Sequence, residues 1–171
     1  ALTGHHLVHV NLGIFILVLK PAYLVILNTI KTGKEIETSK IFKMKKIITT
    51  KHAPAPIGPY NQAVLTGNML YTSGQIAIDP TTNELFKGSL EEETHLVMKN
   101  LEAILKQADM TFENVIKTSI FISDMNNFST INKIYAEYFS EETAPARETV
   151  EVANLPKFVN VEISAIAVMD A

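Results

Sequence analysis

The sequence predicts an α+β fold, with one mixed β-sheet of about six strands and two helices packed on one face. Two segments have the spacing of amphipathic helices, and β-rich segments occur before, between and after them. Helices between strands, with paired strands at both ends, are typical of a single sheet that carries its helices on one side. The strands are so apolar that the other face must also be covered, and further copies of the chain would cover it simply.

The first half of the predicted sheet consists of a strand, a loop and a hairpin. Residues 44–50 combine apolar residues with two threonines and predict a short strand. The three prolines and one glycine of residues 51–59 predict a loop. Two β-rich runs, 62–65 and 69–73, flank Thr-Gly-Asn, which is typical of a hairpin. Residues 76–87 follow as a loop.

The clearest predicted helix covers residues 90–108. Ser89 is a favourable N-cap, and Glu92 three residues later completes the pattern of a capping box. Three successive glutamates, 91–93, suit the positive end of the helix, so we interpret them as a solvated helix start rather than a metal site. One face is apolar at helical spacing.

The second half of the sheet alternates with one more helix. Residues 115–123 are β-branched and predict a strand, and residues 128–139 carry an aromatic stripe that predicts a helix packed on the core. Residues 148–152 predict a short strand. Residues 160–169 alternate and then become wholly apolar, which indicates a largely buried final strand.

Residues 1–43 differ in composition from the rest of the chain. They hold two acids and five lysines, whereas residues 44–171 hold 16 acids and ten basic residues. Lys20 and Pro21 interrupt the apolar run, which weakens it as a membrane span, and a membrane or packing role is the remaining alternative. We interpret residues 1–43 as an extension (a leader, a targeting segment or non-native upstream sequence) and residues 44–171 as the functional domain, with Met44 as the natural start. Residues 44–171 show no sign of membrane association.

Composition and motifs exclude several classes of function. The net charge of −3 gives no broad basic surface for nucleic acid. Cysteine is absent, which excludes thiolate chemistry and fits a reducing compartment such as the cytoplasm; an organelle is the alternative if residues 1–43 are a targeting segment. There is no phosphate loop, dinucleotide fingerprint or HExxH motif.

Two charged residues stand out against this background. Arg147 is the only arginine in the chain, and its planar fork binds a carboxylate through two parallel hydrogen bonds, which lysine cannot do. Glu162 lies inside an apolar strand, where an unpartnered carboxylate is costly. We expect the two on neighbouring strands joined by the turn at 154–157. The alternatives are a surface salt bridge for Arg147 and an outward-facing position for Glu162.

Two glycine-containing segments could bring backbone close to a ligand. They are residues 58–62, with Tyr60, and residues 72–75, with Ser73 and Gly74. Each is a weak signal alone, because Gly-Pro-Tyr also suits a structural turn. Ser73 lacks the Gly-x-Ser-x-Gly elbow, so a serine hydrolase is a poor interpretation.

Four segments together resemble the RidA/YjgF family in their order and spacing. They are Ala-Pro-Ala-Pro-Ile-Gly-Pro-Tyr-Asn-Gln-Ala-Val (53–64), Thr-Ser-Gly-Gln-Ile (72–76), Ala-Pro-Ala-Arg-Glu-Thr-Val-Glu-Val-Ala-Asn-Leu-Pro (144–156) and Val-Glu-Ile-Ser-Ala-Ile-Ala-Val (161–168). The resemblance covers residues 44–171 and implies a chorismate-mutase-like fold and a homotrimer with active sites at the subunit interfaces.

The resemblance also implies an activity, which is the hydrolytic deamination of reactive 2-imino acids such as 2-iminobutanoate and 2-iminopropanoate. Arg147 matches the arginine that binds the substrate carboxylate, and Glu162 matches the glutamate that positions or activates water. Tyr60, Ser73 and Gly74 fall in the matched pocket segments. Thr149 is implied as a further substrate-binding residue. It stands where many members have cysteine, which is tolerable if the position only lines the pocket and argues against an essential thiol. The implied reaction needs no metal and no cofactor.

Two other functions stay open at this point. Some relatives carry the description of a ribonuclease or translation inhibitor, although the balance of −6 over residues 44–171 argues against RNA binding. The other is a non-enzymatic, chaperone-like protein that binds small metabolites.

Overall fold

The computed structural model describes residues 45–169, which form a six-stranded sheet in the order β1-β2-β3-β6-β4-β5. The strands are β1 (Lys46–Ile48), β2 (Ala63–Thr66), β3 (Met69–Thr72), β4 (Val115–Ile122), β5 (Ala146–Glu151) and β6 (Val161–Val168). The helices are α3 (Leu90–Gln107) and α4 (Phe128–Ala136), with short 3-10 turns at Phe112–Asn114, Met125–Asn127 and Pro156–Phe158. This architecture confirms the predicted α+β fold.

The sheet is mixed because of one crossover. β4, α4 and β5 form a unit in which the two strands are parallel and the helix lies between them in sequence. All other pairings are antiparallel, and β6 enters the sheet between β3 and β4. The predicted hairpin is confirmed: Thr66 pairs with Met69 around a two-residue turn whose Gly67 has a φ of 59°.

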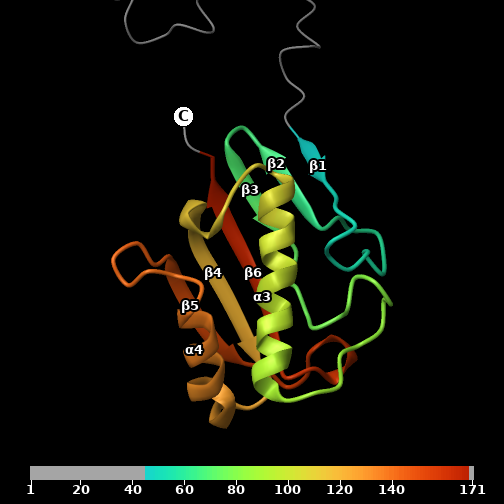
Figure 1. The fold of residues 1–171 in the computed structure, drawn as a ribbon, viewed down its shortest axis with the longest axis vertical. Helices are drawn as coiled ribbons and strands as arrows, with labels where there is room; N and C mark the ends of the chain where they lie inside the picture. Colours follow the sequence, from blue (N-terminus) through green and yellow to red (C-terminus); the bar gives the residue numbers. More distant parts are fainter. Residues whose placement is uncertain (1–44, 170–171) are drawn as a thin grey trace, which may run out of the picture. The chain divides into compact units, whose positions relative to one another are not determined.

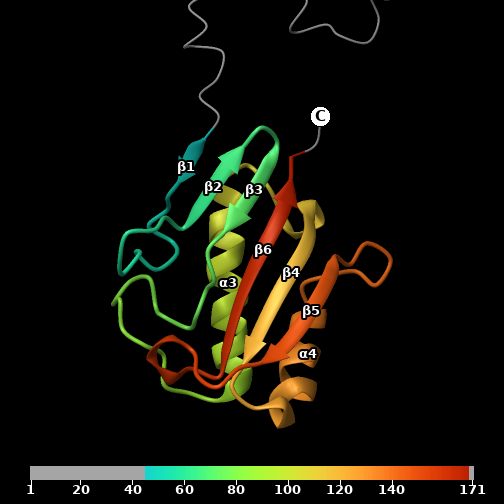
Figure 2. The ribbon, with the colours of Figure 1, turned by 180° about the vertical axis from the view of Figure 1, so that it is seen from behind.

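Helices α3 and α4 cover the same face of the sheet, and no helix within residues 45–169 lies on the opposite face (Figures 1 and 2). The core between helices and sheet is aliphatic. Its fully buried large side chains include Leu70, Met98, Leu101, Ile104, Leu105, Ile120, Ile122 and Ile163. Alternate residues of β6 are buried in this core, as the predicted strand required.

The start of α3 confirms the capping box and corrects one detail of the prediction. The Ser89 hydroxyl accepts a hydrogen bond from the Glu92 N–H, and the Glu92 carboxylate accepts one from the Ser89 N–H. Glu93, expected among the solvated glutamates, is buried. Its carboxylate accepts bonds from the N–H and the side-chain amide of Asn160, at 2.8 and 2.6 Å. The third glutamate therefore ties α3 to the start of β6.

Two element boundaries differ from the prediction. α4 ends at Ala136 instead of residue 139, and the next two aromatic residues lie in the turn that follows. Tyr138 and Phe139 there pack edge-on against Phe112, at centroid distances of 5.4 and 5.1 Å. β5 begins at Ala146, two residues before the predicted strand. The aromatic stripe thus belongs to the core, although only part of it is helical.

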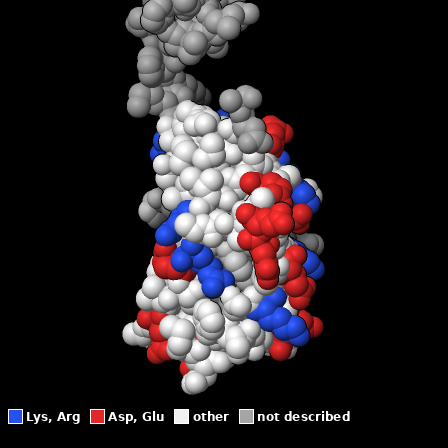
Figure 3. All heavy atoms as spheres, turned by 90° about the vertical axis from the view of Figure 1, so that its left-hand side faces the viewer, with Lys and Arg blue, Asp and Glu red and all other residues white. Residues whose placement is uncertain are grey.

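The helix-free face has an apolar surface and a charged corner. Ile47, Tyr71 and Val150 are exposed on this face. At the corner, Ser119 donates a hydrogen bond to Glu148, and Lys117 forms an ion pair with the same carboxylate. The side of the molecule formed by α4 and β5 carries a band of acidic side chains beside a smaller group of basic ones (Figure 3).

Within residues 45–169, no helix is long and apolar enough to cross a membrane. The predicted extension, residues 1–43, lies outside the described residues.

Candidate functional site

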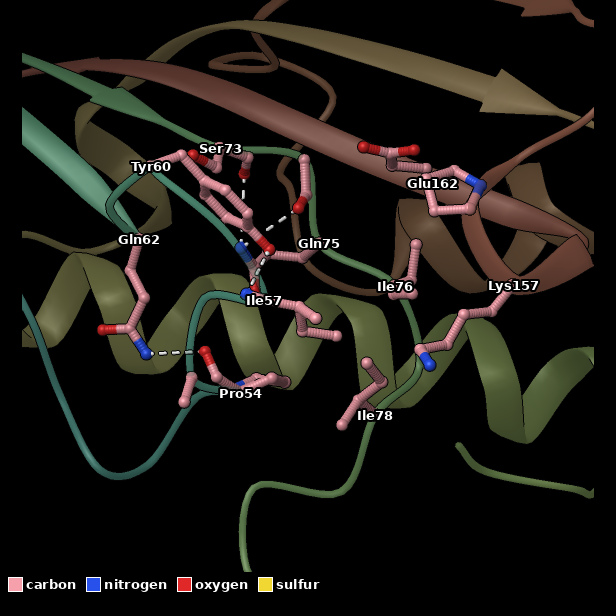
Figure 4. Close-up of a pocket in the computed structure, with 13 residues that line it drawn as sticks. Pro54, Ile57, Tyr60, Gln62, Ser73, Gln75, Ile76, Ile78, Lys157 and Glu162 are labelled. Carbon is pink, nitrogen blue, oxygen red and sulfur yellow. Dashed lines mark hydrogen bonds between the residues drawn. The ribbon is translucent and has the colours of Figure 1, made fainter. Parts of the chain in front are cut away.

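A cavity of about 570 Å³ opens where β3 ends and β6 begins (Figure 4). Its wall is mainly apolar and is made by three segments of the chain: the loop before β2, the residues after β3, and the turn before β6. The lining residues are Pro54, Ala55, Ile57, Tyr60, Gln62, Ser73, Gly74, Gln75, Ile76, Ile78, Pro156, Lys157 and Glu162. The size is typical of a small-molecule site, for which about 300–1,000 Å³ is usual.

Glu162 supplies the carboxylate of this cavity. β6 turns alternate residues toward the core, which leaves Glu162 half-buried on the helix-free face. No described residue donates a hydrogen bond to its carboxylate. Burial raises the pKa of the Glu162 carboxyl above its ordinary value. The group is therefore a stronger base than an exposed glutamate would be.

Gly74 allows Glu162 to lie where it does. A Cβ atom at position 74 would be 1.8 Å from Glu162 Oε1 and 2.7 Å from its Cδ. Only a residue without a side chain leaves room for the carboxylate against the backbone. Gly74 is positioned in turn by its neighbour, because the Gln75 N–H donates to the Ile163 carbonyl at 2.8 Å.

Tyr60 and Ser73 both lie on the cavity wall, but their side chains differ in exposure and in hydrogen bonding. The Ser73 hydroxyl donates to the Asn61 carbonyl at 2.6 Å, so it fixes the loop before β2 against the end of β3. The Tyr60 ring is half-exposed, and its hydroxyl accepts a bond from the Ile57 N–H at 3.2 Å. Tyr60 therefore has a free ring face for a ligand, whereas Ser73 mainly shapes the wall.

The buried side chain of Gln62 fixes the course of the same loop. Its amide oxygen accepts from the Thr50 N–H at 2.7 Å. Its amide nitrogen lies 2.8–3.0 Å from the carbonyl oxygens of Thr50, Ala53 and Pro54.

Arg147 lies away from this cavity, at the edge strand β5. The guanidinium donates to the Asn132 side-chain oxygen at 2.7 Å and lies 5.0 Å from the Tyr135 ring centroid and 5.9 Å from that of Phe128. These three residues, all on α4, form a cradle for Arg147. No described carboxylate is within ion-pair distance of it. The cation is thus positioned and exposed, beside a separate cleft of about 430 Å³.

The expectation that Arg147 and Glu162 lie on neighbouring strands is wrong. Arg147 is paired with Thr118 of β4, and Glu162 is paired with Phe121 on the other side of β4. The reason is the β4–α4–β5 crossover, which places β5 beside β4 and leaves β6 to pair with the opposite edge. A short sequence connection between two strands does not make them partners.

Thr149 follows Arg147 on the same face of β5. Its hydroxyl oxygen is buried and has no hydrogen-bond partner among the described residues. A buried hydroxyl without a partner is unusual in a native structure and calls for an explanation. Of the predicted site residues, the structure therefore brings Tyr60, Ser73, Gly74 and Glu162 together, and places Arg147 and Thr149 elsewhere.

Lys157 is a lining residue that the sequence analysis did not select. It lies in the turn before β6, and its side chain extends along the cavity wall past Ile76 toward Ile78 (Figure 4). Its place directly after Leu-Pro, between the two predicted site residues, was the signal that could have found it. Among residues 45–169, no cluster of three His, Asp or Glu side chains is suited to a metal ion.

Comparison with known proteins identifies relatives of this domain. The model of the Endoribonuclease L-PSP family matches residues 50–169. A RutC family protein of Synechocystis is 52% identical over 125 residues, which are 72% of this chain and 96% of the relative. The 2-iminobutanoate/2-iminopropanoate deaminase of Mus musculus is 47% identical over 125 residues, or 73% of this chain and 92% of the relative. The human protein of the same description is 44% identical over 125 residues, covering 73% and 90%.

Solved structures agree with these sequence matches. A putative endoribonuclease from Thermotoga maritima is 46% identical with a TM-score of 0.72, covering 75% of this chain and all of the other. E. coli TdcF, solved with bound serine, is 44% identical with a TM-score of 0.69, covering 73% and 99%. The chain belongs to the Endoribonuclease L-PSP family, which includes proteins described as RutC, Rid and YjgF.

Proposed function

We propose that this protein hydrolyses reactive 2-imino acids, such as 2-iminobutanoate and 2-iminopropanoate, to 2-oxo acids and ammonia. The observation that carries the proposal is the half-buried Glu162 carboxylate, held against Gly74 in an apolar cavity with no hydrogen-bond donor of its own. Such a group is suited to accept a proton from water. The deaminase description of the mammalian relatives supports the same reaction.

The proposed reaction requires that the substrate carboxylate is held in place and that a base lies near the C=N carbon. Bidentate binding of the substrate carboxylate by Arg147 would place the adjacent C=N carbon. Water then attacks that carbon of the protonated imine while Glu162 accepts one water proton, giving a neutral carbinolamine. Glu162 returns this proton to the nitrogen, the C–N bond breaks and ammonia leaves. The oxygen forms the carbonyl as the remaining hydroxyl proton passes to the Glu162 carboxylate, which releases it to solvent. Holding the substrate supplies much of the rate enhancement, because imines are intrinsically reactive.

In this proposal the active site is shared between copies of the chain, arranged as a homotrimer. Within one chain, Arg147 lies on β5 facing α4, away from the Glu162 cavity. A second copy that covers the exposed helix-free face could bring its own Arg147 to this cavity. That arrangement also buries Ile47, Tyr71 and Val150, which are otherwise exposed apolar side chains.

The domain assignment and the location of the protein belong to the same proposal. We assign the activity to residues 44–171, because the family match spans residues 50–169, and treat residues 1–43 as an extension. We place the protein in the cytoplasm, since a chain without cysteine fits a reducing compartment.

The direct test is the hydrolysis of freshly generated 2-iminobutanoate. A threonine dehydratase would supply the imine, and semicarbazide would trap what is not hydrolysed. We expect the full-length protein to lower the yield of semicarbazone, and Arg147→Ala to leave it unchanged. Equal trapping with and without the wild-type protein would overturn the proposed activity.

A mixing experiment tests the shared site. Arg147→Ala and Glu162→Gln are each expected to lose most of the activity, but unfolding and refolding them together should restore part of it. In a mixed assembly some cavities combine an intact Glu162 with an intact Arg147 from another chain. No recovery, despite mixed assemblies detected by mass, would place both residues in one chain's site.

A ribonuclease is the competing activity, because the family description includes that word. The face shown in Figure 3 carries a band of acidic side chains, which does not favour the binding of RNA phosphates. RNA cleavage that falls steeply with added salt and survives in Glu162→Gln would favour the ribonuclease.

A further inference from the structure

Lys157 and Glu162 are the two charged residues of the described chain that line the cavity. Lys157 lies in the turn before β6, and its side chain extends along the cavity wall past Ile76 toward Ile78 (Figure 4). Among residues 45–169, no carboxylate is within ion-pair distance of its ammonium group. The cavity therefore contains a cation whose charge is left without a partner in the described chain.

The backbone holds Lys157 in a conformation that side chains disfavour. Lys157 has a φ of 57° and Phe158 follows with a φ of 58°, in the left-handed region that is costly for residues other than glycine. The turn is fixed on both sides, because Leu155 and Val159 are buried. The Phe158 N–H also donates to the Leu155 carbonyl at 2.9 Å. Strain that persists under such constraints is typical of functional sites, and here one of the strained residues lines the cavity.

The Lys157 ammonium and the Glu162 carboxylate do not pair with each other. Glu162 projects from β6 beside Gly74, and no ion pair joins it to Lys157. Burial raises the pKa of the Glu162 carboxyl, and no cation opposes this shift. A ligand anion bound to Lys157 would therefore leave Glu162 free to accept a proton.

We propose that Lys157 is a specificity-determining residue, which binds the distal carboxylate of 2-imino dicarboxylic acids such as 2-iminoglutarate. The inference rests on the proposed function, in which Arg147 of another copy binds the carboxylate next to the C=N carbon and Glu162 is the base. A cavity of about 570 Å³ has room for a substrate longer than 2-iminobutanoate. Its mainly apolar wall strengthens the attraction between the ammonium and a second carboxylate, because less water surrounds the pair.

The test compares two substrates of equal chain length in one variant. 2-Iminoglutarate ends in a carboxylate and 2-iminopentanoate in a methyl group, and amino-acid oxidases with catalase would generate them from glutamate and norvaline. Lys157→Met keeps the unbranched stem and removes the charge. We expect its KM for 2-iminoglutarate to rise about fivefold, which is the effect of losing one partly exposed ion pair. The KM for 2-iminopentanoate should change less than about twofold.

Two further variants separate this role from a general effect of charge. Lys157→Arg keeps a cation and should retain the wild-type preference for 2-iminoglutarate. Lys87→Met is the matched control, since Lys87 is an exposed lysine outside the cavity lining, and it should leave both KM values unchanged. Added salt should raise the KM for 2-iminoglutarate more in wild type than in Lys157→Met, because salt screens a partly exposed pair. An equal salt effect in the two proteins would contradict the ion pair.

A binding measurement keeps the inference separate from the proposed activity. 2-Oxoglutarate and 2-oxopentanoate, the 2-oxo acids that correspond to the two imines, would be titrated calorimetrically into wild type and Lys157→Met. A selective loss of 2-oxoglutarate affinity supports the inference even if the protein hydrolyses neither imine. Equal weakening of both ligands would assign Lys157 to the carboxylate that they share, and would overturn the inference. Unchanged affinities, or no binding of 2-oxoglutarate to wild type, would overturn it as well.

Discussion

Arg147 and Glu162 project from opposite faces of the same sheet, with β4 between their strands. Their partners on β4, Thr118 and Phe121, are three residues apart and therefore face opposite ways. Thr118 is buried and bonded to Tyr135 of α4, so Arg147 lies on the helix side. One chain consequently displays a carboxylate-binding cation and a base that it does not itself bring together.

Replacing Arg147 by lysine tests whether the shape of the cation matters. We expect Arg147→Lys to lower kcat/KM for 2-iminobutanoate by about 100-fold, because lysine keeps the charge but loses the bidentate geometry. Steady-state kinetics would measure the effect, with mass and unfolding midpoint checked against wild type. Turnover at the wild-type rate would refute the bidentate role.

Glu162→Gln tests the base and its titration. Burial raises the pKa of Glu162, so we expect wild-type kcat/KM to fall with decreasing pH from above the ordinary range of a glutamate. The variant should bind 2-oxobutanoate and show a rate about 100-fold lower without that low-pH limb. Loss of ligand binding would instead make Glu162 a binding or structural residue.

The raised pKa of Glu162 also predicts how the stability of the folded protein depends on pH. A carboxyl whose pKa is raised by folding stabilises the folded protein below its unfolded pKa, and this contribution is lost as pH rises through the folded value. Glu162→Gln should therefore raise the unfolding midpoint relative to wild type at pH 7, with a smaller difference at pH 4. A difference that grows as the pH falls would contradict burial as the cause.

Gly74→Ala should displace the Glu162 carboxylate without changing its chemical identity. The new Cβ would overlap the Glu162 carboxylate, which must rotate away, so we expect kcat to fall by about tenfold or more. Gly58→Ala is the matched control, because a Cβ there meets only the Tyr60 ring at an ordinary 3.7 Å. Equal activity of the two variants would show that the Gly74 contact is dispensable.

Asn132→Ala should loosen the cradle of Arg147. The guanidinium loses its 2.7 Å hydrogen bond, and we expect KM to rise about tenfold with little change in kcat. Asn127→Ala is the control next to the same helix, since the Asn127 side chain makes no capping bond. A fall in kcat alone would assign Asn132 to the chemical step instead.

Much of the fold could be predicted because its signals are local. The capping box of Ser89 and Glu92, the turn at Gly67 and the alternation of β6 each lie within one short segment. The position of β6 between β3 and β4 could not be predicted, because strand pairing depends on the whole topology. The same limit made the expected proximity of Arg147 and Glu162 wrong.

The candidate site was predictable by residue type but not by its contacts. The isolated carboxylate of Glu162 and the single arginine were visible in the sequence. The cradle at Asn132 was not, because fifteen residues separate it from Arg147 and the contact depends on how α4 packs. Nor does a pattern of residue types reveal the strained backbone at Phe158.

The buried amide of Gln62 has a consequence for how this wall of the cavity can evolve. All four of its hydrogen bonds go to main-chain atoms of Thr50, Ala53 and Pro54, and none to a side chain. The hydrogen bonds that fix the course of the loop therefore do not depend on which side chains these three positions carry. Substitutions at loop positions can therefore change which ligands the cavity accepts, while the backbone course of the loop stays the same as long as residue 62 remains glutamine.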